Sequence, residues 1–275
     1  MRRNFAQILK SGKVDYKKEY KKLYELLFSG DEEEDNCNSV YAALSHSFTS
    51  FYFRGTYLSL QEFDEENGFN FPDPSQKDPK FNDLILLMEY FYNMLIVYQA
   101  CAPYTFGINV DFYMQHILCL CKKIGYKQAR QNGFFIFVKE DAVSTSVAES
   151  ELIPDDLSYK LITYDHHSMH GNLDEKKTII IRLSGLLEAQ RGKLHQVNSG
   201  LESDLFCIFN NFNIRHNNSD SISKKYQPVM ANMEKKELEK WYDETYQMCL
   251  LAFMELEHAD RKPKIDAIKE KLDKK

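Results

Sequence analysis

The stretch Glu234–His258, EKKELEKWYDETYQMCLLAFMELEH, carries the pattern that decides the fold. Its apolar and aromatic side chains recur every three or four residues, which places them on one face of an α-helix. The pattern therefore predicts a long amphipathic helix with one side against a core. The predicted core face consists of Leu238, Trp241, Tyr242, Thr245, Cys249, Ala252 and Leu256.

Similar spacing recurs along the chain and predicts further helices on both sides of a β-hairpin. The hairpin is indicated by Asn132-Gly133, which precedes a run rich in β-forming side chains at 134–139. The 275 residues include only 11 Gly and 7 Pro, whereas an all-β sandwich would need a turn about every 8–12 residues. The other predicted helices cover residues 16–28, 40–53, 83–98, 110–123, 144–164 and 172–197, with one more starting at 201.

These elements predict a mainly α protein in three parts. We expect an N-terminal helical domain (1–123), a β-hairpin connector that acts as a hinge (124–148) and a C-terminal helical bundle (149–275). The glycine- and proline-containing stretch 65–82 predicts a surface loop, more a linker than a lid. The acidic run 31–35 predicts a solvated loop, and we expect the lysine-rich tail after Pro263 to fray.

Composition narrows the classes of function. A net charge of −6 and a pI near 5.8 argue against coating of nucleic acid by bulk electrostatics, although a local RNA site stays open. None of the six cysteines forms a CxxC pair, which favours free core thiols over zinc or disulfides. The sequence shows no signal peptide and no uncharged apolar run of about 18 residues. We therefore expect a cytoplasmic protein with no membrane partner.

The segment Phe209–Asn218, FNNFNIRHNN, is the main candidate site. On a helix continued from Leu201, Arg215 and His216 would flank the apolar stripe at about 100° per residue. The guanidinium group of an arginine can bind a phosphate through two hydrogen bonds, and a histidine can act as a general acid or base on an RNA hydroxyl. Alternatively, Arg215 pairs with a carboxylate such as Asp204 or Asp243, and the asparagines cap a helix end.

Two other polar groups have simpler interpretations. His166 and His170 have the spacing of two metal ligands, with Glu175 as a third, but no complete ligand set follows. A helix-end position is favoured for them, and a solvated helix terminus for Arg191 and His195. The sequence has no phosphate-binding loop, no dinucleotide fingerprint and no nucleophile elbow. We therefore predict no metal and no cofactor.

Three stretches together resemble a known family. They are Leu205–Asn218, the histidine-rich stretch Tyr164–Leu173 and the stretch Trp241–Tyr246. Residues 149 to 258 resemble the C-terminal domain of bacterial abortive-infection proteins of the HEPN class, helical bundles that commonly act as RNA-cutting toxins. The resemblance implies a homodimer whose paired motifs face a shared cleft.

The resemblance implies a catalytic pair, with Arg215 on the scissile phosphate and His216 as acid and base. Asn210, Asn211 and Asn217 would bind the RNA or orient this pair. In the family the arginine and histidine are usually separated by several residues, whereas here they are adjacent.

The leading functional hypothesis is an anti-phage effector that acts as a metal-independent endoribonuclease, with an antitoxin or a phage protein as its trigger. The alternative is a non-catalytic HEPN-like binding or sensor protein that acts through dimerisation and partner recognition, which the adjacent arginine and histidine favour. A third interpretation is a regulator that binds a nucleotide in the same cleft.

Overall fold

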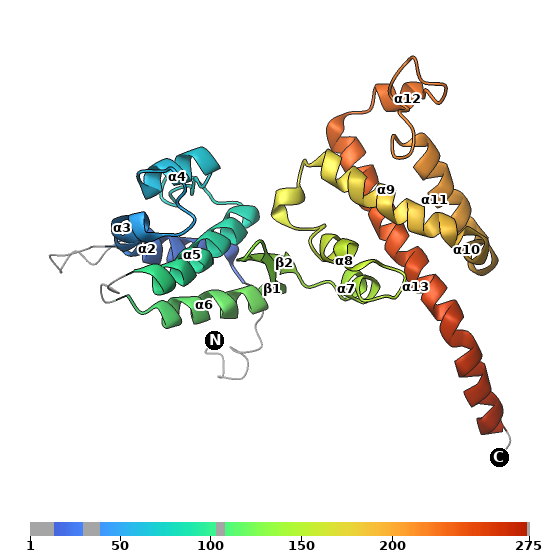
Figure 1. Ribbon diagram of the computed structural model, residues 1–275, viewed down its shortest axis with the longest axis horizontal. Helices are drawn as coiled ribbons and strands as arrows, with labels where there is room; N and C mark the ends of the chain where they lie inside the picture. Colours follow the sequence, from blue (N-terminus) through green and yellow to red (C-terminus); the bar gives the residue numbers. More distant parts are fainter. Residues whose placement is uncertain (1–13, 30–38, 103–107, 274–275) are drawn as a thin grey trace, which may run out of the picture. The chain divides into compact units, whose positions relative to one another are not determined.

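The computed structural model describes residues 14–29, 39–102 and 108–273. These form two compact units, Met1–Glu140 and Asp141–Lys275, which Figure 1 draws in blue to green and in green to red. Both units are mainly helical, and a two-stranded hairpin is the only sheet among the described residues. The mainly α class with a short hairpin is therefore confirmed.

The first unit is built around helix α5 (Phe81–Cys101), which is buried along most of its length. By length and composition alone α5 could cross a membrane, but 67% of its most apolar window is buried inside the protein, as in a core helix. The elements around it are α2 (Tyr16–Phe28), α3 (Val40–Ser47), η1 (Phe48–Ser50), α4 (Leu60–Asn67), α6 (Val110–Lys123), β1 (Tyr126–Gln131) and β2 (Phe134–Lys139).

Local sequence signals explain several boundaries in this unit. The Asp15 side chain accepts the Lys18 backbone N–H at the start of α2, and Ser39 caps α3 in the same way. Asn132 and Gly133 both have positive φ, 51° and 89°, as a two-residue turn between twisted strands requires. The predicted helix 16–28 and the hairpin are confirmed.

The stretch 65–82 differs from the predicted loop at both ends. Helix α4 runs to Asn67 and ends at Gly68, which takes the left-handed conformation with φ 74°. Helix α5 already begins at Phe81. Phe69 and Phe71 pack against the core, so the loop between the two helices is anchored. The acidic run 31–35 lies outside the described residues.

The hairpin belongs to the first unit. Strand β2 packs against α5, and Glu140, which follows it, closes the first unit. Residues 142–148, which we included in a connector, form the first helix of the second unit. The reason is the aromatic face of β2, which is buried against the same core as α5.

The second unit is a helical bundle around α13 (Lys235–Asp273) and α9 (Leu173–Ala189). Its other elements are α7 (Ala142–Ala148), α8 (Asp155–Ile162), η2 (His167–Met169), α10 (Arg191–Val197), α11 (Ser199–Asn211) and α12 (Pro228–Ala231). The helix predicted over 172–197 is divided at Gln190, whose backbone (φ −103°, ψ 5°) leaves the helical region.

Helix α13 is longer than the sequence pattern suggested. The tail that we expected to fray continues as a helix through Pro263 to Asp273. Residues after Pro263 are mostly good helix formers. Their helix propensity offsets the loss of the one backbone hydrogen bond for which proline lacks the N–H donor. In Figure 1 this part of α13 extends beyond the other helices of its unit.

Candidate functional site

Arg215 lies just past the end of α11 and is bound by groups of α9. Its Nη2 donates to the Ser184 carbonyl at 2.7 Å, and its Nε donates to the Ser184 hydroxyl at 3.2 Å. Its Nη1 pairs with the Glu188 carboxylate. The guanidinium also lies 5.1 Å from the ring centroids of both Phe206 and Phe209. All three nitrogens of the Arg215 guanidinium therefore donate hydrogen bonds within the protein.

The carboxylate that pairs with Arg215 is not one of those we predicted. Glu188 takes that place, whereas Asp243 accepts a hydrogen bond from Lys176 at 2.7 Å. The prediction placed Arg215 by continuing α11, but the helix ends at Asn211. Asn213 then takes a left-handed conformation with φ 58°, which turns the chain towards α9.

The second arginine–histidine pair joins the same network. Arg191 lies 4.1 Å from the Phe206 ring centroid, so this ring contacts both guanidiniums. Glu202 binds Arg191 at 2.6 Å and His195 at 3.2 Å. These hydrogen bonds lower the pKa of the Glu202 carboxyl. The network thus balances its arginines with carboxylates around one aromatic ring.

His216 and Asn217 are both exposed. Among the described residues, no side-chain hydrogen bond of His216 is present, whereas Asn217 bonds within its own loop to Asp220 and Ser219. Asn211 donates to the Cys207 carbonyl one turn earlier on α11. The structure therefore does not bring these side chains together with the Arg215 guanidinium, and their catalytic and RNA-binding roles stay predictions.

Asn218 is the structural centre of the asparagine-rich segment. It is fully buried, and its amide donates to the carbonyls of Asn210 and Lys225 at 3.0 and 2.7 Å. Its Oδ1 accepts the Asn213 backbone N–H, and Asn213 Oδ1 accepts the Asn218 N–H in return. This reciprocal pair closes the loop after α11, a role that the sequence pattern did not reveal.

The histidines at the η2 turn are not gathered with Glu175. His166 Nδ1 lies 2.7 Å from the Ser168 hydroxyl and caps η2, while His170 is exposed. Glu175 is bound by Lys160 at 2.7 Å. The favoured interpretation placed these histidines at the carboxyl end of a helix, whereas His166 caps the amino end of η2.

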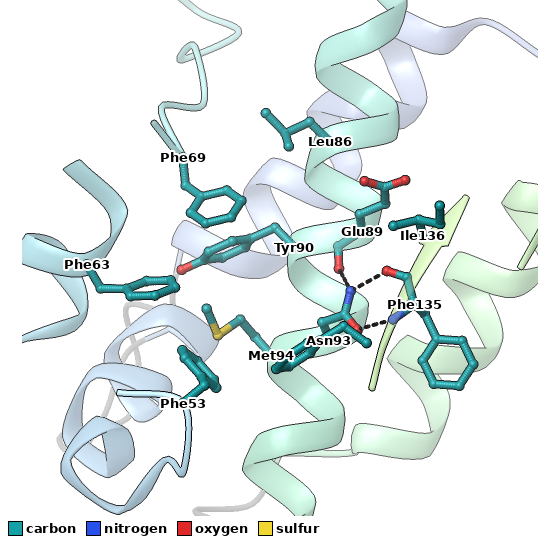
Figure 2. A pocket seen from close by; sticks show the side chains of 11 residues that line it. Phe53, Phe63, Phe69, Leu86, Glu89, Tyr90, Asn93, Met94, Phe135 and Ile136 are labelled. Carbon is teal, nitrogen blue, oxygen red and sulfur yellow. Dashed lines mark hydrogen bonds between the residues drawn. The ribbon is translucent and has the colours of Figure 1, made fainter. Parts of the chain in front are cut away.

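A cavity of about 380 Å³ lies in the first unit, between α4, α5 and β2 (Figure 2). We call it the aromatic pocket. Six aromatic rings, two aliphatic side chains and a methionine supply nearly all of its wall, and the polar groups are Glu89, Asn93 and the Tyr90 hydroxyl. Its lining residues are Phe53, Phe63, Phe69, Leu86, Glu89, Tyr90, Asn93, Met94, Phe134, Phe135 and Ile136.

Asn93 holds one wall of the aromatic pocket in place. Its Oδ1 accepts the Phe135 N–H at 2.8 Å and its Nδ2 donates to the Phe135 carbonyl at 2.7 Å, as the dashed lines in Figure 2 show. Two residues along β2, the Phe137 N–H donates to Glu89 Oε1 at 2.6 Å. Two side chains of α5 thus bind the outer edge of the hairpin, which an unpaired strand would otherwise leave open.

The side-chain donors that line the aromatic pocket are already engaged. Asn93 Nδ2 donates to the carbonyls of Glu89 and Phe135, and the Tyr90 hydroxyl donates to Asp64 at 2.9 Å. The other polar atoms of the lining are acceptors, namely the oxygens of the Glu89 carboxylate, which accepts the Phe137 N–H, and those of Tyr90 and Asn93. Among the described residues that line the pocket, none carries a positive charge.

The Asp64 carboxylate is buried next to the Tyr90 hydroxyl. It accepts hydrogen bonds from the hydroxyls of Tyr41 and Tyr90 at 2.8 and 2.9 Å. Burial raises the pKa of the Asp64 carboxyl to about 6, against the opposing effect of these two hydrogen bonds. The Asp64 carboxylate thus fixes the Tyr90 ring, which forms part of the pocket wall.

The sequence pattern did not reveal the aromatic pocket, because its walls come from separate segments. Phe53, Phe63 and Phe134 belong to a loop, a helix and a strand, and no local spacing joins them. Comparison with protein families, with curated proteins and with solved structures finds no match for this chain.

Proposed function

We propose that this chain is a non-catalytic binding or sensor protein, with the aromatic pocket as its small-molecule site. The observation that carries the proposal is the pocket itself, an apolar cavity of about 380 Å³ with a few convergent polar groups. Ligand sites in proteins commonly have this size and this composition. The walls are set in place by hydrogen bonds from α5 to β2, so the site is largely formed before a ligand arrives.

The chemistry of the wall selects the class of ligand. Aromatic faces attract cations, and a nearby carboxylate attracts a cation as well. Since the lining side-chain donors are engaged within the protein, a ligand must bring its own donors. A small organic amine with an apolar body meets both requirements: its body contacts rings such as Phe63 and Phe69, and its ammonium group faces Glu89.

The surroundings of Arg215 favour this proposal over nuclease chemistry. A guanidinium that already binds Ser184 and Glu188 would have to exchange these partners for a phosphate. We retain a role in abortive infection, in the cytoplasm and with a phage protein or an antitoxin as partner, as part of the proposal. Endoribonuclease activity at Arg215 and His216 is the less favoured candidate.

Binding at the aromatic pocket is tested with three probes that share one carbon skeleton, 4-phenylbutylamine, 4-phenylbutanol and 4-phenylbutyrate. We expect the amine to raise the thermal unfolding midpoint at millimolar concentration, the alcohol to act weakly and the carboxylate to have no effect. Glu89→Gln keeps an acceptor for the Phe137 N–H and should weaken amine binding about tenfold, or 1.4 kcal/mol. Glu66→Gln, an exposed position on α4, is the matched control.

Equal effects of the three probes, or none at all, would contradict the assignment of the ligand class. Nuclease activity is tested separately by expressing wild type, Arg215→Ala and His216→Ala at matched levels and following growth and total RNA integrity. The proposal predicts intact RNA in all three. RNA cleavage by wild type that both substitutions abolish would restore the nuclease hypothesis.

A further inference from the structure

Helix α13 presents an apolar stripe that its own unit leaves uncovered. Its members are spread from the bundle to the end of the helix, and their exposed fractions are 40% or more. They are Leu251 (48%), Met254 (40%), Ile265 (40%), Ile268 (58%) and Leu272 (64%). The opposite side of α13 faces the core of the unit through Phe253 and Leu256, which are fully buried.

The stripe has the spacing of a coiled-coil seam. Positions 251, 254, 258, 261, 265, 268 and 272 are separated alternately by three and four residues, with His258 and Arg261 at the centre. Side chains that recur on average every 3.5 residues stay in contact with one partner helix along the whole seam. Pro263 lies seven residues after Leu256, so it shares the side of α13 that faces away from the seam.

We propose that this seam binds the same seam of a second copy of the chain, with the two α13 helices antiparallel. Centred on His258 and Arg261, this arrangement places Leu251 against Ile268 of the other copy and Met254 against Ile265. Each apolar pair occurs twice because of the two-fold symmetry. The central polar layer, in which His258 meets Arg261, fixes the register.

Charges that flank the seam favour this orientation. Side chains beside the seam are mainly acidic before its central residues, His258 and Arg261, and mainly basic after them. In an antiparallel pair, the acidic part of each helix therefore lies beside the basic part of the other. Glu257 then faces Lys264 of the other copy, and Glu255 faces Lys262. A parallel pair would instead place Lys264 beside Lys269 of the other copy. The Glu257 carboxylate also pairs with Arg261 one turn along its own helix, which holds it beside the seam.

The proposal is tested by sedimentation analysis of the full chain over a range of concentrations. Wild type should form a dimer, and Ile265→Asp should raise the dissociation constant at least tenfold without unfolding, since Ile265 is exposed and outside the core. Lys264→Glu should weaken the dimer, and Glu257→Lys combined with Lys264→Glu should restore it. Lys236→Glu, the same change of charge on an exposed site near the start of α13, is the control.

Each contrary result overturns the proposal in its own way. A monomer at every concentration excludes the interface. Tighter association of Lys264→Glu indicates a parallel pair, because the change would remove the repulsion from Lys269. A monomer that binds vesicles of anionic lipid through the lysine-rich end of α13 assigns the stripe to a membrane surface instead. A dimer that Ile265→Asp leaves intact places the contact elsewhere on the chain.

Discussion

At the scale of single residues, Arg215 and His216 are neighbours with different surroundings. The guanidinium of Arg215 is bound by Ser184 and Glu188, whereas His216 is exposed. Arg215→Ala would remove three hydrogen bonds to α9 and the contacts with two aromatic rings, so we expect the free energy of unfolding to fall by about 2–3 kcal/mol. His216→Ala should change it by less than about 0.5 kcal/mol. Urea denaturation measures both, and equal effects of the two substitutions would contradict the structural role of Arg215.

The asparagine pair Asn217 and Asn218 gives a second contrast. Asn218→Ala removes a fully buried amide that donates to the carbonyls of Asn210 and Lys225, and we expect a loss of about 3 kcal/mol in the free energy of unfolding. Asn217→Ala, at an exposed position, serves as the control, with a change under about 0.5 kcal/mol. A small effect at Asn218 would show that the loop after α11 does not depend on this amide.

Asp64 predicts a pH dependence of stability. Its folded-state pKa is about 6 against an ordinary 3.8, so the folded protein binds this proton more tightly than the unfolded chain. Stability from this group is therefore present at low pH and is lost as the pH rises from about 4 to about 6. The difference in unfolding free energy between wild type and Asp64→Asn should change across this window by at most about 3 kcal/mol. A flat difference from pH 4 to pH 7 would contradict the raised pKa.

At the scale of elements, the hairpin edge depends on one side chain of α5. Asn93→Ala removes both hydrogen bonds to the Phe135 backbone, and we expect a loss of about 2 kcal/mol in unfolding free energy. Amide hydrogen exchange at Phe135 should accelerate, whereas exchange at Ile136, which lies opposite Ala129 of β1, should change less. Unchanged exchange at Phe135 would show that the strand edge is protected without Asn93.

Local patterns predicted the elements well where the deciding signal was itself local. Helix α2 and the Asn132-Gly133 turn follow from caps, spacing and turn chemistry within a few residues. Helix α4 was not predicted, since its eight residues carry only two large apolar side chains, Leu60 and Phe63. The helix after Pro263 was missed because one proline was taken to end a run of good helix formers.

At the scale of the whole chain, sites made by distant residues were beyond sequence reasoning. The alternative in which Arg215 pairs with a carboxylate fits the structure, yet its partner Glu188 lies 27 residues away on another helix. Neither of the two candidate carboxylates named from the sequence, Asp204 and Asp243, is that partner. The aromatic pocket escaped prediction for the same reason, since its rings meet only after α4, α5 and β2 have packed together.

At the aromatic pocket, we propose binding of an amine with an apolar body. It is tested most directly by titrating 4-phenylbutylamine into protein carrying ¹³C-methyl methionine and following the Met94 signal, assigned with Met94→Leu. We expect a saturable shift of the Met94 signal, since Met94 lines the pocket, and none for Met230, which lies in the second unit. An unmoved Met94 signal, or shifts of equal size at both methionines, would contradict it.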